Sequence, residues 1–177
     1  MLKEKAEIKG FTLIEVVAVL IVLSILAAVA VTVMGNDSAR LAAQTEALRA
    51  NIRYSQALSM TTGRCWGIRM NETNGRYWIF NCDDPANCPW DSNRVCPPGM
   101  ECDGLNRFRM GEDFGVSLSF PGEGNSRTLS FDDFGRPFWD SSTEALQALL
   151  ASDLTLTLTD SPNSTSIIIR AETGFVP

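Results

Sequence analysis

Cysteine is the most reactive residue type in this 177-residue chain, and five cysteines are present: Cys65, Cys82, Cys88, Cys96 and Cys102. Four of them fall within 21 residues, separated by gaps of five, seven and five residues. Zinc sites usually need gaps of two to four residues, so that one turn can present two thiolates. The spacing therefore favours disulfides made in an oxidising compartment, and the odd number leaves one cysteine free, buried or paired between chains.

The pairing of these cysteines stays open at the level of sequence. Short-range links between Cys82 and Cys88 and between Cys96 and Cys102 would leave Cys65 over. A link between Cys65 and Cys82 is an equal alternative, because a hairpin would bring their strands together.

The chain contains no histidine. This excludes Ser-His-Asp and Cys-His nucleophilic catalysis and histidine-ligated zinc. No glycine-rich P-loop for a nucleotide is present either. Two acidic pairs, Asp83-Asp84 and Asp132-Asp133, offer oxygen ligands for calcium, but they lack EF-hand spacing and we interpret them as turn-forming carboxylates. We expect no enzymatic activity, no metal and no cofactor.

The charge balance disfavours nucleic acid as a partner. The net charge is −6, and from residue 10 onward twelve arginines face nineteen acidic residues. A general phosphate binder carries the opposite field. The arginines that could gather near strand ends are Arg64, Arg69, Arg76 and Arg170. Among the tryptophans, Trp66 and Trp78 are expected in the core, and Trp90 is the better candidate for a partner contact.

A single carboxylate, Glu15, interrupts the longest apolar run, which extends over the 24 residues from Phe11 to Met34. As a helix this run would be about 36 Å long, sufficient for a bilayer core. All three lysines precede the run, which places the N-terminus on the cytoplasmic side. A carboxylate at the bilayer centre costs roughly 2.5–3.5 kcal/mol, so we expect Glu15 to be functional and to have a cationic partner.

Three simpler explanations of this run fit less well. A cleaved secretory signal has an apolar region of only about 7–15 residues. A lipoprotein signal needs a cysteine just after the run, and none is there. A plain membrane anchor fits the length but gives Glu15 no role.

The segment Lys9-Gly10-Phe11-Thr12-Leu13-Ile14-Glu15, followed by about twenty apolar residues, resembles the prepilin signal of type IV pilins and type II secretion pseudopilins. The resemblance implies that a prepilin peptidase cuts after Gly10 and methylates the new amino group of Phe11. It also implies that Glu15 of one subunit neutralises the Phe11 amine of a neighbour in a growing filament. Two such buried charges are tolerable only when they are paired.

Beyond the apolar run, residues 35–38 can interrupt or kink the helix, and a second helical pattern covers 38–61. It places six residues near one face, which we expect to pack on a sheet: Leu41, Thr45, Leu48, Ile52, Ser55 and Leu58. A hairpin is predicted at 64–70 and 76–82 around Asn74-Gly75, followed by a long irregular loop tied by disulfides. Further strands are predicted at 115–120, 127–131, 154–159 and 166–171, with a turn at 160–164 and a short helix at 142–151.

Three parts of the head narrow the resemblance to the GspH/FimT group of minor pseudopilins and minor pilins. They are the end of the second helix leading into a strand at Ile68, the turn Phe134-Gly135-Arg136-Pro137, and a closing strand with Glu172-Thr173-Gly174-Phe175-Val176. The segment 82–114 lies outside the resemblance.

The predicted fold class is α+β, with a long N-terminal helix, membrane-spanning in its first half, packed on an antiparallel β-sheet head. The predicted divisions are a leader at 1–10, a transmembrane or filament-core helix at 11–35, its amphipathic second half at 36–62, and a periplasmic head at 63–177 that contains the loop 82–114.

By this resemblance we expect a minor pseudopilin of a type II secretion system, held in the inner membrane before assembly and in a filament afterwards. Its expected partners are the prepilin peptidase, other pilin or pseudopilin subunits and an inner-membrane assembly platform with its ATPase. The alternatives are a type IV pilus minor pilin that serves pilus assembly, adhesion or DNA uptake, and a membrane-anchored periplasmic binding protein.

Overall fold

The computed structural model describes residues 12–34, 36–82, 93–122, 124–140 and 149–177, with the backbone alone for 28–34, 36 and 37. The chain divides into two compact units, Met1–Asp37 and Ser38–Pro177. Each unit is described by itself below.

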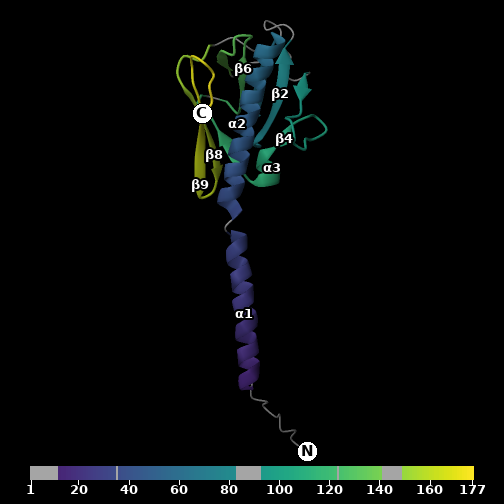
Figure 1. Cartoon of the computed structure of the whole chain (residues 1–177), viewed down its shortest axis with the longest axis vertical. Coiled ribbons are helices and arrows are strands. Elements are labelled where there is room, and N and C mark those ends of the chain that lie inside the picture. The colour runs from purple at the N-terminus through teal and green to yellow at the C-terminus, as the bar shows by residue number, and fades with distance from the viewer. Residues whose placement is uncertain (1–11, 35, 83–92, 123, 141–148) are drawn as a thin grey trace, which may run out of the picture. The chain divides into compact units, whose positions relative to one another are not determined.

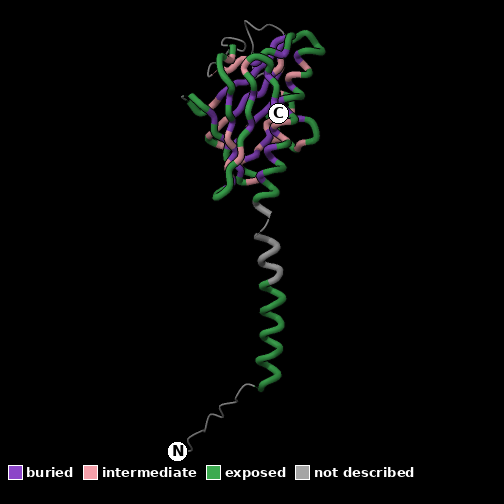
Figure 2. The backbone as a smooth tube through the Cα atoms, turned by 60° about the vertical axis from the view of Figure 1, so that its left-hand side comes forward, coloured by how far each residue is buried: buried purple, intermediate pink, exposed green. Residues whose placement is uncertain are grey.

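The first unit contains helix α1 (Leu13–Met34), drawn in purple and blue in Figure 1. Leu, Ile, Val and Ala follow one another here with few interruptions, so apolar side chains occupy every side of the helix. Every side chain described in this unit, from residue 12 to residue 27, is exposed (Figure 2). Helix α1 therefore buries none of these side chains within its own unit.

The second unit, which we call the head, begins with most of helix α2 (Asn36–Thr62). Its predicted apolar face is buried, with Leu41, Leu48 and Ile52 at its centre. Small polar residues share this face, and Thr45, Ser55 and Ser59 each donate a hydroxyl hydrogen bond to the carbonyl four residues earlier. The helix ends where Gly63 adopts a φ of +63°, a left-handed conformation that glycine adopts without a Cβ clash.

Two antiparallel sheets complete the head. The larger has the order β3-β2-β1-β6-β7, and β4 also pairs with β2. Its strands are β1 (Cys65–Asn71), β2 (Arg76–Cys82), β3 (Arg94–Val95), β4 (Phe108–Arg109), β6 (Ser126–Phe131) and β7 (Pro137–Asp140). The smaller has the order β5-β8-β9, with β5 (Ser117–Ser119), β8 (Leu154–Asp160) and β9 (Asn163–Ile169). A five-residue helix, α3 (Met110–Phe114), directly follows β4.

One hydrophobic core joins helix α2 to both sheets. Figure 1 shows α2 running between the β8–β9 pair and strands β2 and β4. Leu48 and Ile52 of α2 belong to the same buried cluster as Ile79 of β2 and Leu156 of β8. The predicted fold class, a helix with an antiparallel sheet head, is confirmed.

Several predicted boundaries need correction. The loop predicted as irregular contains β3, β4 and α3 in its described part, because both short strands pair with β2. Strand β7 was not predicted, and β9 begins at Asn163, which shortens the predicted turn at 160–164. Residues 141–148 of the predicted helix at 142–151 lie outside the described residues, and Leu149 forms a β-bridge with Phe138.

Two turns of the head share one local design, Asp-x-x-x-Arg. In the first, the Asp103 carboxylate accepts hydrogen bonds from the Arg107 backbone N–H at 3.0 Å and from Arg107 Nε at 2.8 Å. In the second, Asp132 accepts the same pair of bonds from Arg136, at 2.8 and 2.6 Å. The fourth residue has a positive φ in both turns, +57° at Asn106 and +78° at Gly135. Asp132 is thus a turn-forming carboxylate, as predicted from the sequence.

Candidate functional site

The N-terminal segment is the candidate functional site. The predicted cleavage and methylation residues, Gly10 and Phe11, lie outside the described residues, and the description begins at Thr12. The Thr12 hydroxyl accepts a hydrogen bond from the Glu15 backbone N–H at 3.4 Å, and the Thr12 carbonyl accepts one from the same N–H at 3.0 Å. Thr12 therefore caps α1, and Glu15 stands at the third helical position.

This position suits a carboxylate. Thr-x-x-Glu is the sequence pattern of a capping box, in which an N-terminal hydroxyl and a glutamate serve the first turn of a helix. A negative charge in that turn also interacts favourably with the positive end of the helix dipole. Glu15 is exposed, so its carboxylate can meet a cation brought by another molecule.

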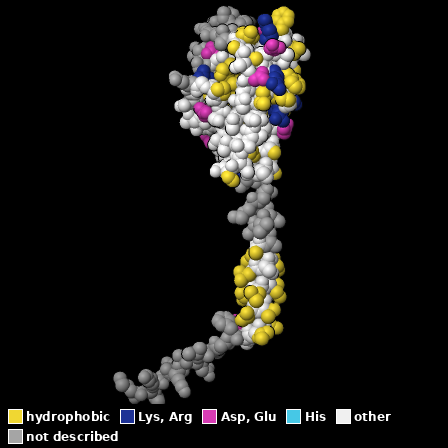
Figure 3. All heavy atoms as spheres, turned by 90° about the vertical axis from the view of Figure 1, so that its left-hand side faces the viewer, with side chains coloured by type: hydrophobic (Ala, Val, Ile, Leu, Met, Phe, Trp, Pro, Cys, Tyr) yellow, Lys and Arg dark blue, Asp and Glu magenta, His cyan; other side chains and the backbone are white. Residues whose placement is uncertain are grey.

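The side chains that follow Glu15 are apolar and uncovered. Leu13 and Ile14 are 84% and 77% exposed, and Val16 to Leu26 continue in the same way. Figure 3 shows these hydrophobic side chains gathered along the described part of α1. Within the part of the chain that the structure describes, no helix combines the length and the apolarity that crossing a membrane requires.

The cysteines separate into bonded and free ones. Cys96 and Cys102 form a disulfide, and Cys82 is disulfide-bonded as well. Cys88, the short-range partner predicted for Cys82, lies outside the described residues. Cys65 is directly opposite Cys82 in the β1–β2 register, yet it is free and buried. The alternative link between Cys65 and Cys82 is therefore wrong.

The environment of Cys65 makes its thiol unreactive. Burial and the negative charge of nearby Asp132 raise the pKa of this thiol to about 12, against a smaller opposing effect of a hydrogen bond with Ser130. Since the thiolate is the nucleophile, a thiol with this pKa is inert at neutral pH.

Three of the four arginines that could gather near strand ends, Arg69, Arg76 and Arg170, have separate partners. Arg69 is buried and donates to the Thr128 hydroxyl at 2.7 Å, Arg76 pairs with Glu112, and Arg170 pairs with Asp153. Each of these three cations thus lies beside a partner of its own.

The tryptophans pack largely as predicted. Trp78 is buried, and Trp66 is half-buried with its indole N–H donating to the Thr62 hydroxyl at 3.0 Å. Trp139 packs edge-on against Phe120, with ring centroids 5.6 Å apart. Trp90 and the acidic pair Asp83-Asp84 lie outside the described residues. No group of metal-binding side chains occurs among the residues that the structure describes.

The two head motifs of the resemblance meet on helix α2. Gln56 Nε2 donates to the Gly135 carbonyl at 2.9 Å and to the Thr173 carbonyl at 2.8 Å. Arg53 donates to the Val176 carbonyl at 2.9 and 2.7 Å. The segment 172–176, predicted as part of a closing strand, is instead a turn and an extended tail after β9. Sequence reasoning missed Gln56 and Arg53, because nothing local marks a residue whose partners lie 79 to 123 positions away.

Comparison with known proteins identifies the N-terminal segment. Residues 7–31 match the family model described as the prokaryotic N-terminal methylation motif, a span that includes Gly10, Phe11 and Glu15. Comparison with the curated proteins finds no significant match. A crystal structure of the type IV minor pilin FimU of Pseudomonas aeruginosa PAO1 is similar, with 11% identity, a TM-score of 0.49, and coverage of 80% of this chain and 90% of that chain. The chain thus carries the N-terminal methylation motif, and helices and antiparallel sheets follow it.

Proposed function

We propose that this chain is a minor pseudopilin of a type II secretion system, a structural subunit rather than an enzyme. Its action is assembly: α1 leaves the inner membrane and joins a bundle of like helices in a filament. One observation carries the proposal. Glu15 lies in the capped first turn of α1, and the described apolar side chains of this helix are all exposed. An apolar helix needs a covering environment, and a carboxylate within it needs a cation.

The methylation motif supports the processing that this function requires. In the proposed sequence of events, a prepilin peptidase removes residues 1–10 and methylates the amine of Phe11. The positive Phe11 amine of one subunit then pairs with Glu15 of a neighbour, which makes both charges tolerable in an apolar bundle. Other pilin-like subunits and an inner-membrane platform with an ATPase are the proposed partners.

The acidic head favours secretion over DNA handling. Nineteen acidic residues against twelve arginines from residue 10 onward would repel a phosphate backbone. This supports a pseudopilin over a pilin that takes up DNA. A minor pilin of a type IV pilus is the alternative that the experiment below separates.

The test is mass spectrometry of filaments sheared from the native cell surface, alongside the membrane fraction. We expect a peptide that begins at N-methylated Phe11 in the envelope fraction and not in surface filaments. Its presence in surface filaments with their major subunit would replace the secretion role by a pilus role. Retention of residues 1–10 in every fraction would overturn the filament proposal and leave a membrane-anchored binding protein.

A further inference from the structure

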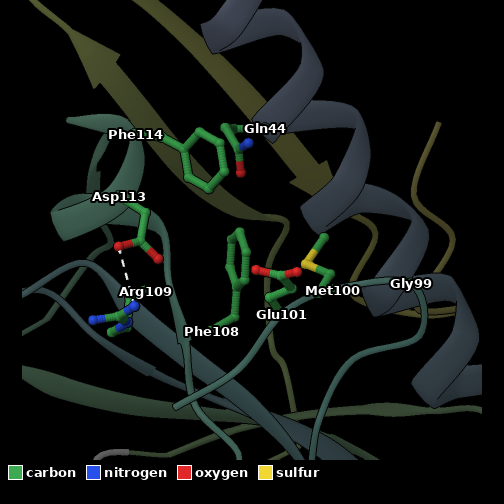
Figure 4. Close-up of a pocket in the computed structure, with 8 residues that line it drawn as sticks. All are labelled: Gln44, Gly99, Met100, Glu101, Phe108, Arg109, Asp113 and Phe114. Carbon is green, nitrogen blue, oxygen red and sulfur yellow. Dashed lines mark ion pairs between the residues drawn. The ribbon is translucent and has the colours of Figure 1, made fainter.

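A pocket in the head lies between α2, the loop after β3 and the short helix α3. It has a volume of about 520 Å³. Its walls include Gln44, Met100, Glu101, Phe108 and Phe114 (Figure 4). None of these residues belongs to the methylation motif or to the head motifs of the resemblance, so the proposed assembly function does not use the pocket.

One wall of this pocket is the loop between Cys96 and Cys102, which contributes Gly99, Met100 and Glu101. A disulfide between the two cysteines closes this loop. Met100 connects this loop to strand β2, because its sulfur accepts a hydrogen bond from the Tyr77 hydroxyl at 3.4 Å. The disulfide and this partly buried contact together hold the backbone of the loop that carries Glu101.

Gln44 supplies an unused hydrogen-bond acceptor. Its side chain is only 9% exposed, and its Oε1 atom is buried without a hydrogen-bond partner. A buried polar atom without a partner is unfavourable, so a ligand that donates an N–H to this oxygen gains a hydrogen bond that the chain itself does not supply. Figure 4 shows the Gln44 amide and the Glu101 carboxylate directed into the space beside the two phenylalanine rings.

The charges around the pocket leave one carboxylate free. Arg109 is engaged by two acids, Asp113 at 3.4 Å and Glu112 at 3.8 Å. Among the described residues, Glu101 makes no ion pair. The lining, with Glu101 and Asp113 against Arg109, therefore has a net negative charge, which disfavours an anion and favours a cation.

The aromatic walls fit a flat cation on an alkyl arm. The rings of Phe108 and Phe114 lie 5.7 Å apart between centroids and are tilted by 30°. Ring faces attract cations, and they pack well against a planar guanidinium. A guanidinium also carries five N–H donors, enough to satisfy an amide oxygen and a carboxylate together.

We propose that this pocket binds an alkylguanidinium group that lies beside the Phe108 and Phe114 rings, with Gln44 Oε1 and the Glu101 carboxylate accepting its N–H donors. The same chemistry can come from an arginine side chain of a partner protein or from a free guanidino compound.

The test is calorimetric titration of the full chain in non-ionic detergent with N-acetyl-arginine amide. The matched probe is N-acetyl-citrulline amide, which has nearly the same shape without the charge. We expect the arginine probe to bind at least tenfold more tightly. Glu101→Gln and Gln44→Met should each weaken its binding at least fivefold, while Glu46→Gln, an acid-to-amide change at an exposed site of α2, should not.

Equal binding of the two probes, or unchanged binding in Glu101→Gln, would overturn the proposal, as would no binding at millimolar concentration. The unfolding midpoint of each variant confirms that the head is intact. A double Cys96→Ser, Cys102→Ser variant should also bind more weakly, because its loop is no longer closed. Tighter binding of a blocked Ala-Arg-Ala tripeptide than of agmatine would assign the group to a partner protein, and the reverse order to a free compound.

Discussion

Helices α1 and α2 follow one another in the chain but distribute their side chains in opposite ways. In α1 the described apolar side chains are exposed, with Leu20 at 60%. In α2 even polar side chains are buried, with Ser55 at 0%. The cause is the composition of each helix: α1 is apolar on all sides, whereas α2 mixes apolar and polar residues and buries the face that contains Leu41, Leu48 and Ile52.

This difference indicates that α2 stabilises the head and that α1 serves the function of the protein. Helix α2 buries its apolar face against other parts of the head, so it stabilises the head. Helix α1 has no such cover among the described contacts of its unit, so its apolar surface is available to other molecules. Four predictions test this division.

The largest effect is expected from truncating the buried face of α2. Leu48→Ala should lower the free energy of unfolding of the head by about 2–5 kcal/mol, because it leaves a cavity in the shared core. Leu20→Ala in α1 is the matched control and should change it by less than about 0.5 kcal/mol. Denaturant unfolding followed by tryptophan fluorescence measures both. Equal losses in the two variants would refute the division between the helices.

The alkylation rate of Cys65 measures how well the head shields its core from solvent at the start of β1, just after α2 ends. With a thiol pKa of about 12, alkylation by iodoacetamide at pH 8 should be about a thousandfold slower in the native chain than in the unfolded chain. The raised pKa means that the folded state favours the neutral thiol. The logarithm of the native rate should therefore keep rising with pH through pH 10.

Mass spectrometry of the alkylated peptide measures this rate. Levelling of the rate near pH 9 would show that the thiol is not shielded as described. Since the folded pKa lies above the unfolded one, any stability that this thiol contributes is present below about pH 9 and is lost as the pH rises toward 12.

The third prediction concerns the carboxylate of α1. Glu15→Ala should leave cleavage after Gly10 intact and reduce incorporation into filaments at least tenfold, because the Phe11 amine of a neighbour loses its counter-charge. Glu46→Ala removes an exposed carboxylate from α2 and should incorporate normally. Quantitative mass spectrometry of filaments isolated from the envelope fraction compares the two, and normal incorporation of the Glu15 variant would contradict the proposed role.

The smallest effect is expected at Gln56, which ties α2 to two distant segments. Gln56→Ala should destabilise the head by about 1–2 kcal/mol, since the Gly135 and Thr173 carbonyls lose a donor. Thr61→Ala removes an exposed hydroxyl from the same helix and should stay within about 0.5 kcal/mol of the parent. A Gln56 variant as stable as the parent would mean that these two hydrogen bonds are replaced by water.

Much of the fold is readable from the sequence where the signal is local. The buried face of α2 follows from apolar residues spaced by three and four, and the β1–β2 hairpin from two β-rich runs around Asn74-Gly75. Strands β3 and β4 have two residues each, too few to show any alternation. Their existence depends on the open edge of β2, which is a property of the assembled sheet.

The residues of the candidate site and of the pocket also differ in whether a local sequence signal reveals them. The segment from Lys9 to Glu15 and the apolar run that follows it are recognised from residue order alone, because a processing motif consists of residue types at fixed spacing. The folded arrangement decides that Cys65 stays free opposite Cys82 and that Gln56 joins a turn to the tail. It also decides that Gln44 presents an unpaired oxygen to a pocket closed by the Cys96–Cys102 loop. Each of these depends on residues far apart in the chain, and their distances are set when the two sheets close on α2.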